Sequence, residues 1–233
     1  MGARGGGGRR DAARREEHLR RWSQAHGGLE PSPGPVRWWL EGVRRVAEPL
    51  VRARTSPDAL TAAGLVLALA ALWPAAQGGR AALLVPVLLA ASALADGLDG
   101  AVAVLSGRAS RRGAVLDAVA DRVADAAGLA VLWLLGAPAT PVLVAAGAGA
   151  LHEYARARAQ AEGMAGAGAI TVSERPTRVA VAALFPLGCG LHPPVAAPWA
   201  TGGAVAAAVL ALAGLAQLLR AVHRQLGPPP AQP

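Results

Sequence analysis

Long apolar runs, separated by short stretches rich in glycine, proline or arginine, follow one another from Ala59 to Leu219. Each run is close to the roughly 20 residues that an α-helix needs to cross a hydrocarbon core of about 30 Å. The pattern predicts six membrane-spanning helices, at residues 59–77, 81–105, 113–136, 140–162, 177–192 and 198–220. The predicted fold class is therefore an all-α membrane protein with several spans.

A different periodicity precedes the first run. Between Val36 and Ala53 the apolar residues recur at helical spacing, with most arginines elsewhere on the helix. This predicts an amphipathic juxtamembrane helix, residues 36–53, that lies in the membrane surface. A soluble amphipathic helix is the alternative. Residues 1–35 are predicted to form a mobile basic arm, residues 36–222 the membrane domain and residues 223–233 a Pro-rich tail.

The composition supports a membrane protein, because 53% of the 233 residues are hydrophobic and only 16% are charged. This excludes a disordered chain and predicts no nucleic-acid partner. Basic residues cluster before the first span and in alternate loops, whereas the opposite loops contain only Arg80. The asymmetry predicts a multi-pass protein of the cell membrane with both ends in the cytoplasm. The single cysteine, Cys189, excludes an internal disulfide and is predicted to be a small packed residue.

Five aspartates lie inside two otherwise apolar spans, between Asp96 and Asp125. A charged aspartate at the centre of a membrane helix costs about 2.5–3.5 kcal/mol, so such a cluster requires compensation. Asp96 and Asp99 are three residues apart, and Asp117 and Asp121 are four apart, so each pair shares one helix face. If the two helices form a hairpin, the four carboxylates meet between about 6 and 14 Å below its loop.

Four adjacent carboxylates repel one another unless cations neutralise them, and hard divalent ions such as Mg²⁺ or Mn²⁺ prefer oxygen ligands. Two such ions can polarise a phosphate and stabilise both its attacking and its leaving oxygen. The sequence therefore predicts a two-metal site. Asp–Arg ion pairs are the alternative, particularly for Asp125, which has Arg122 and Arg178 as candidate partners.

The spacing of these residues resembles the signature of the CDP-alcohol phosphatidyltransferases, integral membrane enzymes of phospholipid synthesis. The pattern is D-x2-D-G-x2-A-(R)-x8-G-x3-D-x3-D, and it is matched by Asp96, Asp99, Gly100, Ala103, Gly113, Asp117 and Asp121. One position departs from it, because Val104 stands where the family usually has arginine. Arg108, Arg111 or Arg112 in the following loop are candidates for the missing charge.

The resemblance implies a reaction in which two metal ions hold the diphosphate of CDP-diacylglycerol while an alcohol attacks the lipid-side phosphorus and CMP leaves. It implies Asp96, Asp99, Asp117 and Asp121 as metal ligands and Asp121 as the general base. It also implies that Asp58, Gly100, Ala103 and Gly113 lie near the nucleotide. Asp58 is equally suited to cap the first span, and close helix packing is the alternative role of the two glycines.

Two arginine-bearing segments indicate the acceptor alcohol. Arg156, Arg158, Arg175 and Arg178 look like the segments that line the acceptor pocket of family members that use phosphorylated alcohols, with Glu174 orienting one of them. Inositol phosphate is the first choice, glycerol 3-phosphate the second, and phosphatidylglycerol, which would give cardiolipin, stays open. The alternative is that these arginines anchor the chain at the membrane surface. His152 is interpreted as a hydrogen-bonding residue, and the resemblance suggests a homodimer.

Three other functions compete with this prediction. An intramembrane prenyltransferase also uses aspartates and Mg²⁺ to hold a diphosphate, but it needs a second Asp-rich motif, and residues 130–233 contain no aspartate. A cation transporter would need polar residues along a whole ion path, whereas the far ends of these spans are apolar. A catalytically inactive relative is suggested by Val104 alone.

Overall fold

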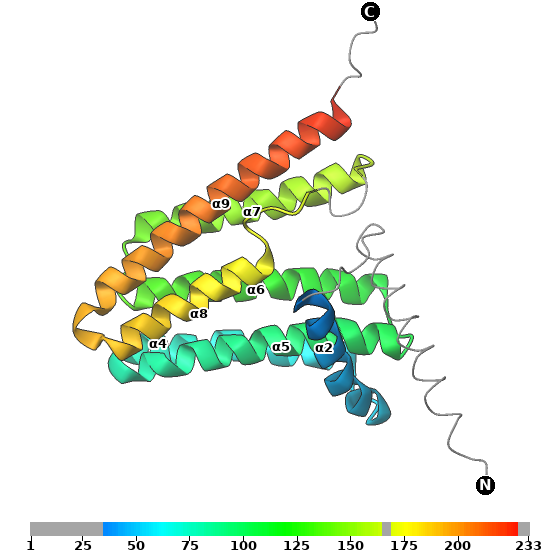
Figure 1. Cartoon of the computed structure of the whole chain (residues 1–233), viewed down its shortest axis with the longest axis horizontal. Helices are drawn as coiled ribbons and strands as arrows, with labels where there is room; N and C mark the ends of the chain where they lie inside the picture. The colour runs from blue at the N-terminus through cyan, green and yellow to red at the C-terminus, as the bar shows by residue number, and fades with distance from the viewer. Residues whose placement is uncertain (1–34, 165–168, 228–233) are drawn as a thin grey trace, which may run out of the picture.

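The computed structural model describes residues 35–164 and 169–227. These residues form helices and no strands, which confirms the all-α fold class (Figure 1). The α-helices are α2 (Pro35–Arg52), α3 (Pro57–Ala70), α4 (Leu72–Gln77), α5 (Leu84–Leu105), α6 (Arg111–Leu134), α7 (Ala139–Ala161), α8 (Arg175–Leu191) and α9 (Ala196–Leu226). Two 3₁₀ turns, η1 (Gly79–Leu83) and η2 (Pro193–Val195), precede α5 and α9. Residues 1–34 of the predicted arm and 228–233 of the predicted Pro-rich tail lie outside the described residues, whereas residues 223–226 of that tail continue α9, so the helix extends beyond its predicted end.

Helices occur at each of the six predicted spans, but they are not equally suited to a bilayer. Three segments of the described residues are long and apolar enough to cross a membrane: Pro57–Gln77, Gly79–Leu105 and Pro193–Leu226. The other three helices differ because α6 carries charged residues over its first two-thirds, α7 carries them in its C-terminal part, and α8 has only 17 residues. Helix positions are therefore confirmed, while the count of six crossings stays a prediction.

The amphipathic segment before the first span is helical, as predicted. Val43 and Ala47 of α2 are buried against Leu98, Ala101 and Val102 of α5. Figure 1 shows α2 crossing near one end of α5 rather than running along it. This contact fixes the end of α2 beside the start of α3, where the chain enters the apolar region.

A tight hairpin joins α5 to α6. Gly107, with φ +68°, ends α5, and the amides of Gly107 and Arg108 donate to the carbonyls of Val104 and Ala103. This is the Schellman arrangement, which favours glycine because the left-handed backbone has no Cβ to clash. Ser110 then caps α6 by accepting a hydrogen bond of 3.0 Å from the Gly113 amide. The two aspartate-bearing helices are thus antiparallel neighbours.

Small residues set the spacing of the helices. A Cβ added to Gly64 of α3 would lie 3.3 Å from the Ser92 carbonyl oxygen of α5, so the two backbones approach closely. Much of the main core is likewise alanine, with Val131, Leu132 and Cys189 fully buried. The Cys189 thiol donates to the Ala196 carbonyl at 3.3 Å, which confirms the prediction of a packed cysteine.

The helices form a layered bundle with an apolar outer surface. In Figure 1, α7 and α9 run together on one side, α6 and α8 occupy the middle, and α5 lies on the far side. Large apolar side chains remain exposed on several helices, including Val66, Val87, Leu143, Leu184 and Val209, each more than half exposed. Such a surface is suited to lipid rather than water.

Candidate active site

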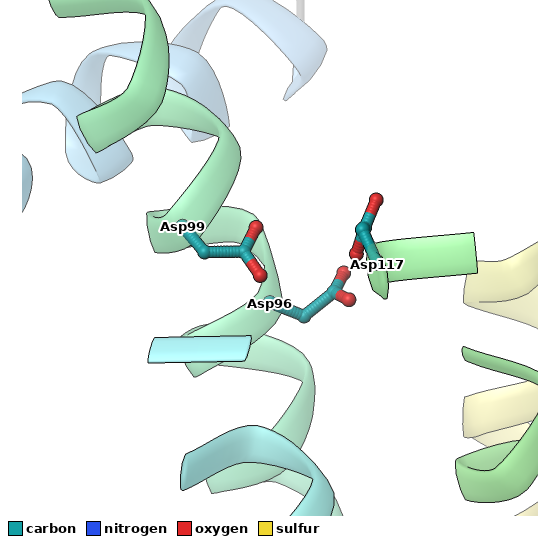
Figure 2. A group of neighbouring side chains, drawn as sticks. All are labelled: Asp96, Asp99 and Asp117. Atoms are coloured by element: carbon teal, nitrogen blue, oxygen red, sulfur yellow. The ribbon is translucent and has the colours of Figure 1, made fainter. Parts of the chain in front are cut away.

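Three of the predicted metal ligands meet at one point between α5 and α6. Figure 2 shows Asp96 and Asp99 projecting from α5 toward Asp117 of α6. One carboxylate oxygen of each lies within 4.8 Å of the others. Asp99 is buried, while Asp96 and Asp117 are partly exposed. The helical spacing and the short loop therefore produce the predicted convergence.

Asp121 lies beside this group and is turned toward arginines. Its Oδ1 contacts Nη1 of Arg175, and its Oδ2 lies 3.8 Å from Arg122 Nη2. The same Arg175 nitrogen lies 2.8 Å from Asp96 Oδ1. Arg175 of α8 therefore bridges carboxylates of α5 and α6. The negative charge of the aspartates is partly balanced by this guanidinium.

The donor set fits a hard divalent cation. Carboxylate oxygens from two helices face a shared space, and they are the ligands that Mg²⁺ and Mn²⁺ prefer. Thr61 of α3 also donates a hydrogen bond to Asp99 Oδ2, so the orientation of this carboxylate is set by a partner outside the cluster. The contact was not evident from the sequence, because Thr61 and Asp99 are 38 residues apart.

A cleft of about 210 Å³ opens next to the three carboxylates, between the start of α3, the end of α5 and the start of α6. The four residues predicted to lie near the nucleotide all line it: Asp58, Gly100, Ala103 and Gly113. A Cβ on Gly113 would lie 3.1 Å from Ser110 Oγ and 3.6 Å from Asp58 Oδ1, so a larger residue would narrow the cleft. Asp58 is not the helix cap, because Ser56 occupies that position and Asp58 lies in the first turn.

The three loop arginines are placed differently. Arg108 lines the cleft, and its Nη1 lies 3.4 Å from the carbonyl oxygens of both Arg54 and Thr55. Arg111 and Arg112 begin α6, are exposed, and do not line the cleft. The structure therefore distinguishes Arg108 from its neighbours.

The four predicted acceptor arginines separate into two sets. Arg156 forms a two-pronged ion pair with Glu174, at 2.6 and 3.1 Å, which confirms that Glu174 orients one of the arginines. Arg178 contacts Asp125, Glu153 and the Ser173 carbonyl. With Arg175, these side chains face inward. Arg158 instead pairs with Glu162 at 2.7 Å on the surface, with 59% of its side chain exposed, so the structure does not bring it to this site.

Glu174 anchors the segment that leads into α8. Burial would raise the pKa of Glu174, but hydrogen bonds from Arg156 and from the Thr171 amide and hydroxyl outweigh it and hold this pKa below its ordinary value. The adjacent His152 is fully buried, with Nε2 3.1 Å from Thr171 Oγ1. His152 is thus a hydrogen-bonding residue, as the sequence suggested. Arg156 and His152 of α7 therefore hold in place the segment that leads into α8.

A second ionic network joins α6, α7 and α8. Arg122 lies 3.3 Å from Asp125 and 3.1 Å from Glu153, and Arg178 contacts the same two carboxylates. This confirms the ion-pair interpretation of Asp125. The role of Glu153 as a shared partner of two arginines was missed, since no local pattern links residue 153 to residues 122 and 178.

These charged residues form the polar end of a cavity of about 530 Å³. Arg122, Asp125, Glu153, Arg175 and Arg178 line one part, and small apolar residues of α6, α7, α8 and α9 line most of the remainder. Because Arg175 both lines this cavity and contacts Asp96, the cavity adjoins the carboxylate cluster. The larger cavity and the smaller cleft therefore both border the carboxylate cluster.

Comparisons with known proteins agree with this architecture. Residues 54–223 match the family model of the CDP-alcohol phosphatidyltransferases. The chain is 37% identical over 192 residues to the phosphatidylinositol phosphate synthase of Mycolicibacterium smegmatis, an alignment that covers 77% of this chain and 82% of that protein.

Solved structures of a related protein show the same fold. The phosphatidylinositol phosphate synthase of Mycobacterium tuberculosis with CDP-DAG bound superposes with a TM-score of 0.64 at 27% identity, over 79% of this chain and 95% of that one. Its complex with manganese and citrate gives a TM-score of 0.62 at 28% identity, over 77% and 88% of the two chains.

The all-helical fold combines apolar spans with clustered carboxylates that could hold a divalent metal, which is an arrangement typical of a membrane enzyme. The chain belongs to the CDP-alcohol phosphatidyltransferase family. It is a transferase of phospholipid biosynthesis, as the resemblance of its aspartate motif implied.

Proposed function

We propose that this protein transfers the phosphatidyl group of CDP-diacylglycerol to inositol phosphate and releases CMP. The observation that carries the proposal is the position of Arg175, which lies against the carboxylate cluster and also lines the larger cavity. A phosphate-bearing acceptor in that cavity would meet this guanidinium next to the site of phosphoryl chemistry. The likeness to two phosphatidylinositol phosphate synthases supports the same acceptor.

Asp96, Asp99, Asp117 and Asp121 are the proposed metal ligands. Three of them already converge, and Asp121 adjoins them through Arg175. Two bound Mg²⁺ or Mn²⁺ ions would neutralise the diphosphate and stabilise charge on its attacking and leaving oxygens. Thr61 would keep the Asp99 carboxylate in its binding orientation.

The smaller cleft is the proposed site of the cytidine nucleotide. Asp58, Gly100, Ala103 and Gly113 line it, and Gly100 has open space where a Cβ would lie, which allows a ligand to approach the backbone closely. The cleft shares Asp99 and Asp117 with the carboxylate cluster, so a nucleotide bound here would present its phosphates to those aspartates.

Asp121 is the proposed general base. The acceptor hydroxyl oxygen forms a bond to the lipid-side phosphorus, the bond from that phosphorus to the CMP oxygen breaks, and the hydroxyl proton passes to Asp121. Arg175 touches this carboxylate, so an acceptor whose phosphate is bound by Arg175 would lie beside the proposed base. CMP leaves as a phosphate monoester.

The acceptor phosphate is proposed to bind Arg175 and Arg178, with Arg156 holding Glu174 and the segment before α8 in place. Guanidinium groups bind phosphate through paired donors. Glycerol 3-phosphate would meet the same arginines, and phosphatidylglycerol is the lipid alternative. Membership in this family favours all three over the prenyltransferase and the transporter.

We further propose that the enzyme crosses the cell membrane six times with both ends in the cytoplasm, and that it acts as a homodimer. The apolar spans and the exposed apolar side chains support membrane insertion. The arginine asymmetry of the loops supports the orientation. Small residues along α7 allow close packing within or between chains.

The acceptor is tested by supplying purified enzyme with CDP-diacylglycerol and Mn²⁺, and offering inositol phosphate, inositol, glycerol 3-phosphate, phosphatidylglycerol and serine in separate reactions. CMP release is expected chiefly with inositol phosphate. The lipid product should then carry two phosphates, one from CDP-diacylglycerol and one from inositol phosphate. If the enzyme prefers glycerol 3-phosphate or phosphatidylglycerol, that alcohol is the acceptor in place of inositol phosphate. CMP release with none of them would support a catalytically inactive relative.

A further inference from the structure

The cleft next to the carboxylate cluster carries more negative than positive side chains, although it is proposed to bind phosphates. Among the described residues that line it, Asp58, Asp99 and Asp117 are acidic and Arg108 is basic. At position 104, where the family signature has arginine, the cleft is lined by a valine. A diphosphate bound here would therefore meet one protein cation in addition to any metal.

The backbone fixes the place of Arg108. It directly follows Gly107, whose left-handed conformation turns the chain, and its amide donates to the Ala103 carbonyl at 2.9 Å. Ala103 itself lines the cleft. The Schellman closure of α5 thus brings residue 108 back beside residues 103 and 104, so the two positions border the same space.

The side chain of Arg108 lines this cleft and reaches the residues that precede α3. Its Nη1 lies 3.4 Å from the carbonyl oxygens of Arg54 and Thr55, just before α3 begins. These two contacts are long for hydrogen bonds, and they involve one of the two terminal nitrogens. The guanidinium therefore retains donors that can turn toward a phosphate on the cleft side.

We propose that Arg108 binds the phosphates of the cytidine nucleotide and takes over the charge that Val104 does not provide. The inference rests on the proposed nucleotide cleft, and it assigns a substrate-binding role to a residue outside the signature. Arg111 and Arg112 do not line the cleft and are not assigned this role. Moving the arginine four residues along the chain preserves the site because the hairpin turn returns it to the same cleft.

A purely structural role is the competing explanation. Arg54 has φ +58° in the turn after α2, and Arg108 contacts its carbonyl, so Arg108 could act only by holding this turn. That role predicts that substitution lowers the stability of the ligand-free protein. It does not predict a loss of affinity that depends on the phosphates of the ligand.

The test measures the dissociation constants of CDP and cytidine for the full-length protein in detergent, with Mg²⁺ present. Arg108→Gln is expected to weaken CDP binding about tenfold, the size expected for loss of a hydrogen bond to a charged group, with little change for cytidine. Arg111→Gln is the matched control, because it removes an arginine three residues away that does not line the cleft. It should bind CDP as the parent does.

The double variant Val104→Arg with Arg108→Gln provides a rescue test. If charge in the cleft is what matters, the arginine restored at position 104 should recover most of the lost CDP affinity. Equal CDP binding by the parent and Arg108→Gln, or an equal loss in Arg111→Gln, would overturn the inference. If the parent itself does not bind CDP, the proposed function fails first, so the two failures are distinguishable.

Discussion

The Arg175 guanidinium lies 2.8 Å from Asp96 Oδ1 and also contacts Asp121, although the two aspartates belong to different helices. Arg175 is the first residue of α8, so one side chain connects three helices at the candidate active site. A divalent ion bound by the carboxylates would compete with this arginine for the same oxygens. Arg175 would then be released toward the larger cavity, where an acceptor phosphate is proposed to bind.

Arg175→Gln is expected to lower kcat/KM for inositol phosphate by about ten- to a hundredfold, because a charge-assisted contact to phosphate is lost. Steady-state kinetics at saturating CDP-diacylglycerol measure the effect. Arg158→Gln is the control, since Arg158 pairs with Glu162 on the surface. An equal loss in both variants would contradict the assignment of Arg175 to the acceptor.

Asp121→Asn is expected to reduce turnover by about a hundredfold or more, because the amide cannot accept the acceptor proton. Binding of CDP should persist, since the other three carboxylates still converge. Single-turnover CMP release together with CDP titration separates these effects. Near-normal turnover would exclude Asp121 as the general base.

Thr61→Val is expected to weaken Mn²⁺ binding by about ten- to a hundredfold, because the hydrogen bond to Asp99 is lost while the side-chain volume is nearly kept. Electron paramagnetic resonance of free Mn²⁺ gives the affinity directly. Thr201→Val is a suitable control, since the Thr201 hydroxyl donates to the Ala197 carbonyl in α9. Unchanged Mn²⁺ affinity in Thr61→Val would show that the contact does not orient the ligand.

Glu174→Gln is expected to destabilise the protein by about 1–3 kcal/mol at neutral pH, because charged hydrogen bonds to Arg156 are lost. The pKa of Glu174 is lowered in the folded state, so its stabilising contribution is present above the unfolded-state pKa and is lost as pH falls through the folded-state pKa. The stability difference between parent and variant should therefore shrink in acid. Thermal unfolding from pH 7 to pH 3 measures it, and a pH-independent difference would argue against this linkage.

The sequence predicted the helices and the convergence of three of the four aspartates, because both depend on local spacing. Three- and four-residue intervals place carboxylates on one helix face, and Gly107 followed by Ser110 forces a tight hairpin. Contacts between distant segments were not predictable in this way. The hydrogen bond from Thr61 to Asp99 depends on how closely α3 and α5 pack, which no local pattern states.

The prediction that both Arg156 and Arg158 face the acceptor was only half right, and helix geometry explains why. Arg156 and Arg158 are two residues apart in α7, so their side chains point to different sides of the helix. Only Arg156 faces Glu174, while Arg158 pairs with Glu162 one turn further along. Spacing alone predicts that the two diverge, but tertiary packing decides which one faces the site.

This protein is proposed to be a metal-dependent phosphatidyltransferase whose acceptor is inositol phosphate. The most direct measurement is CMP release from CDP-diacylglycerol and inositol phosphate by purified protein, first with Mn²⁺, then after chelation, and then with Mn²⁺ restored. CMP release is expected to stop on chelation, to return with the metal and to be absent in Asp121→Asn. Release that continues without metal, or that does not depend on inositol phosphate, would contradict it.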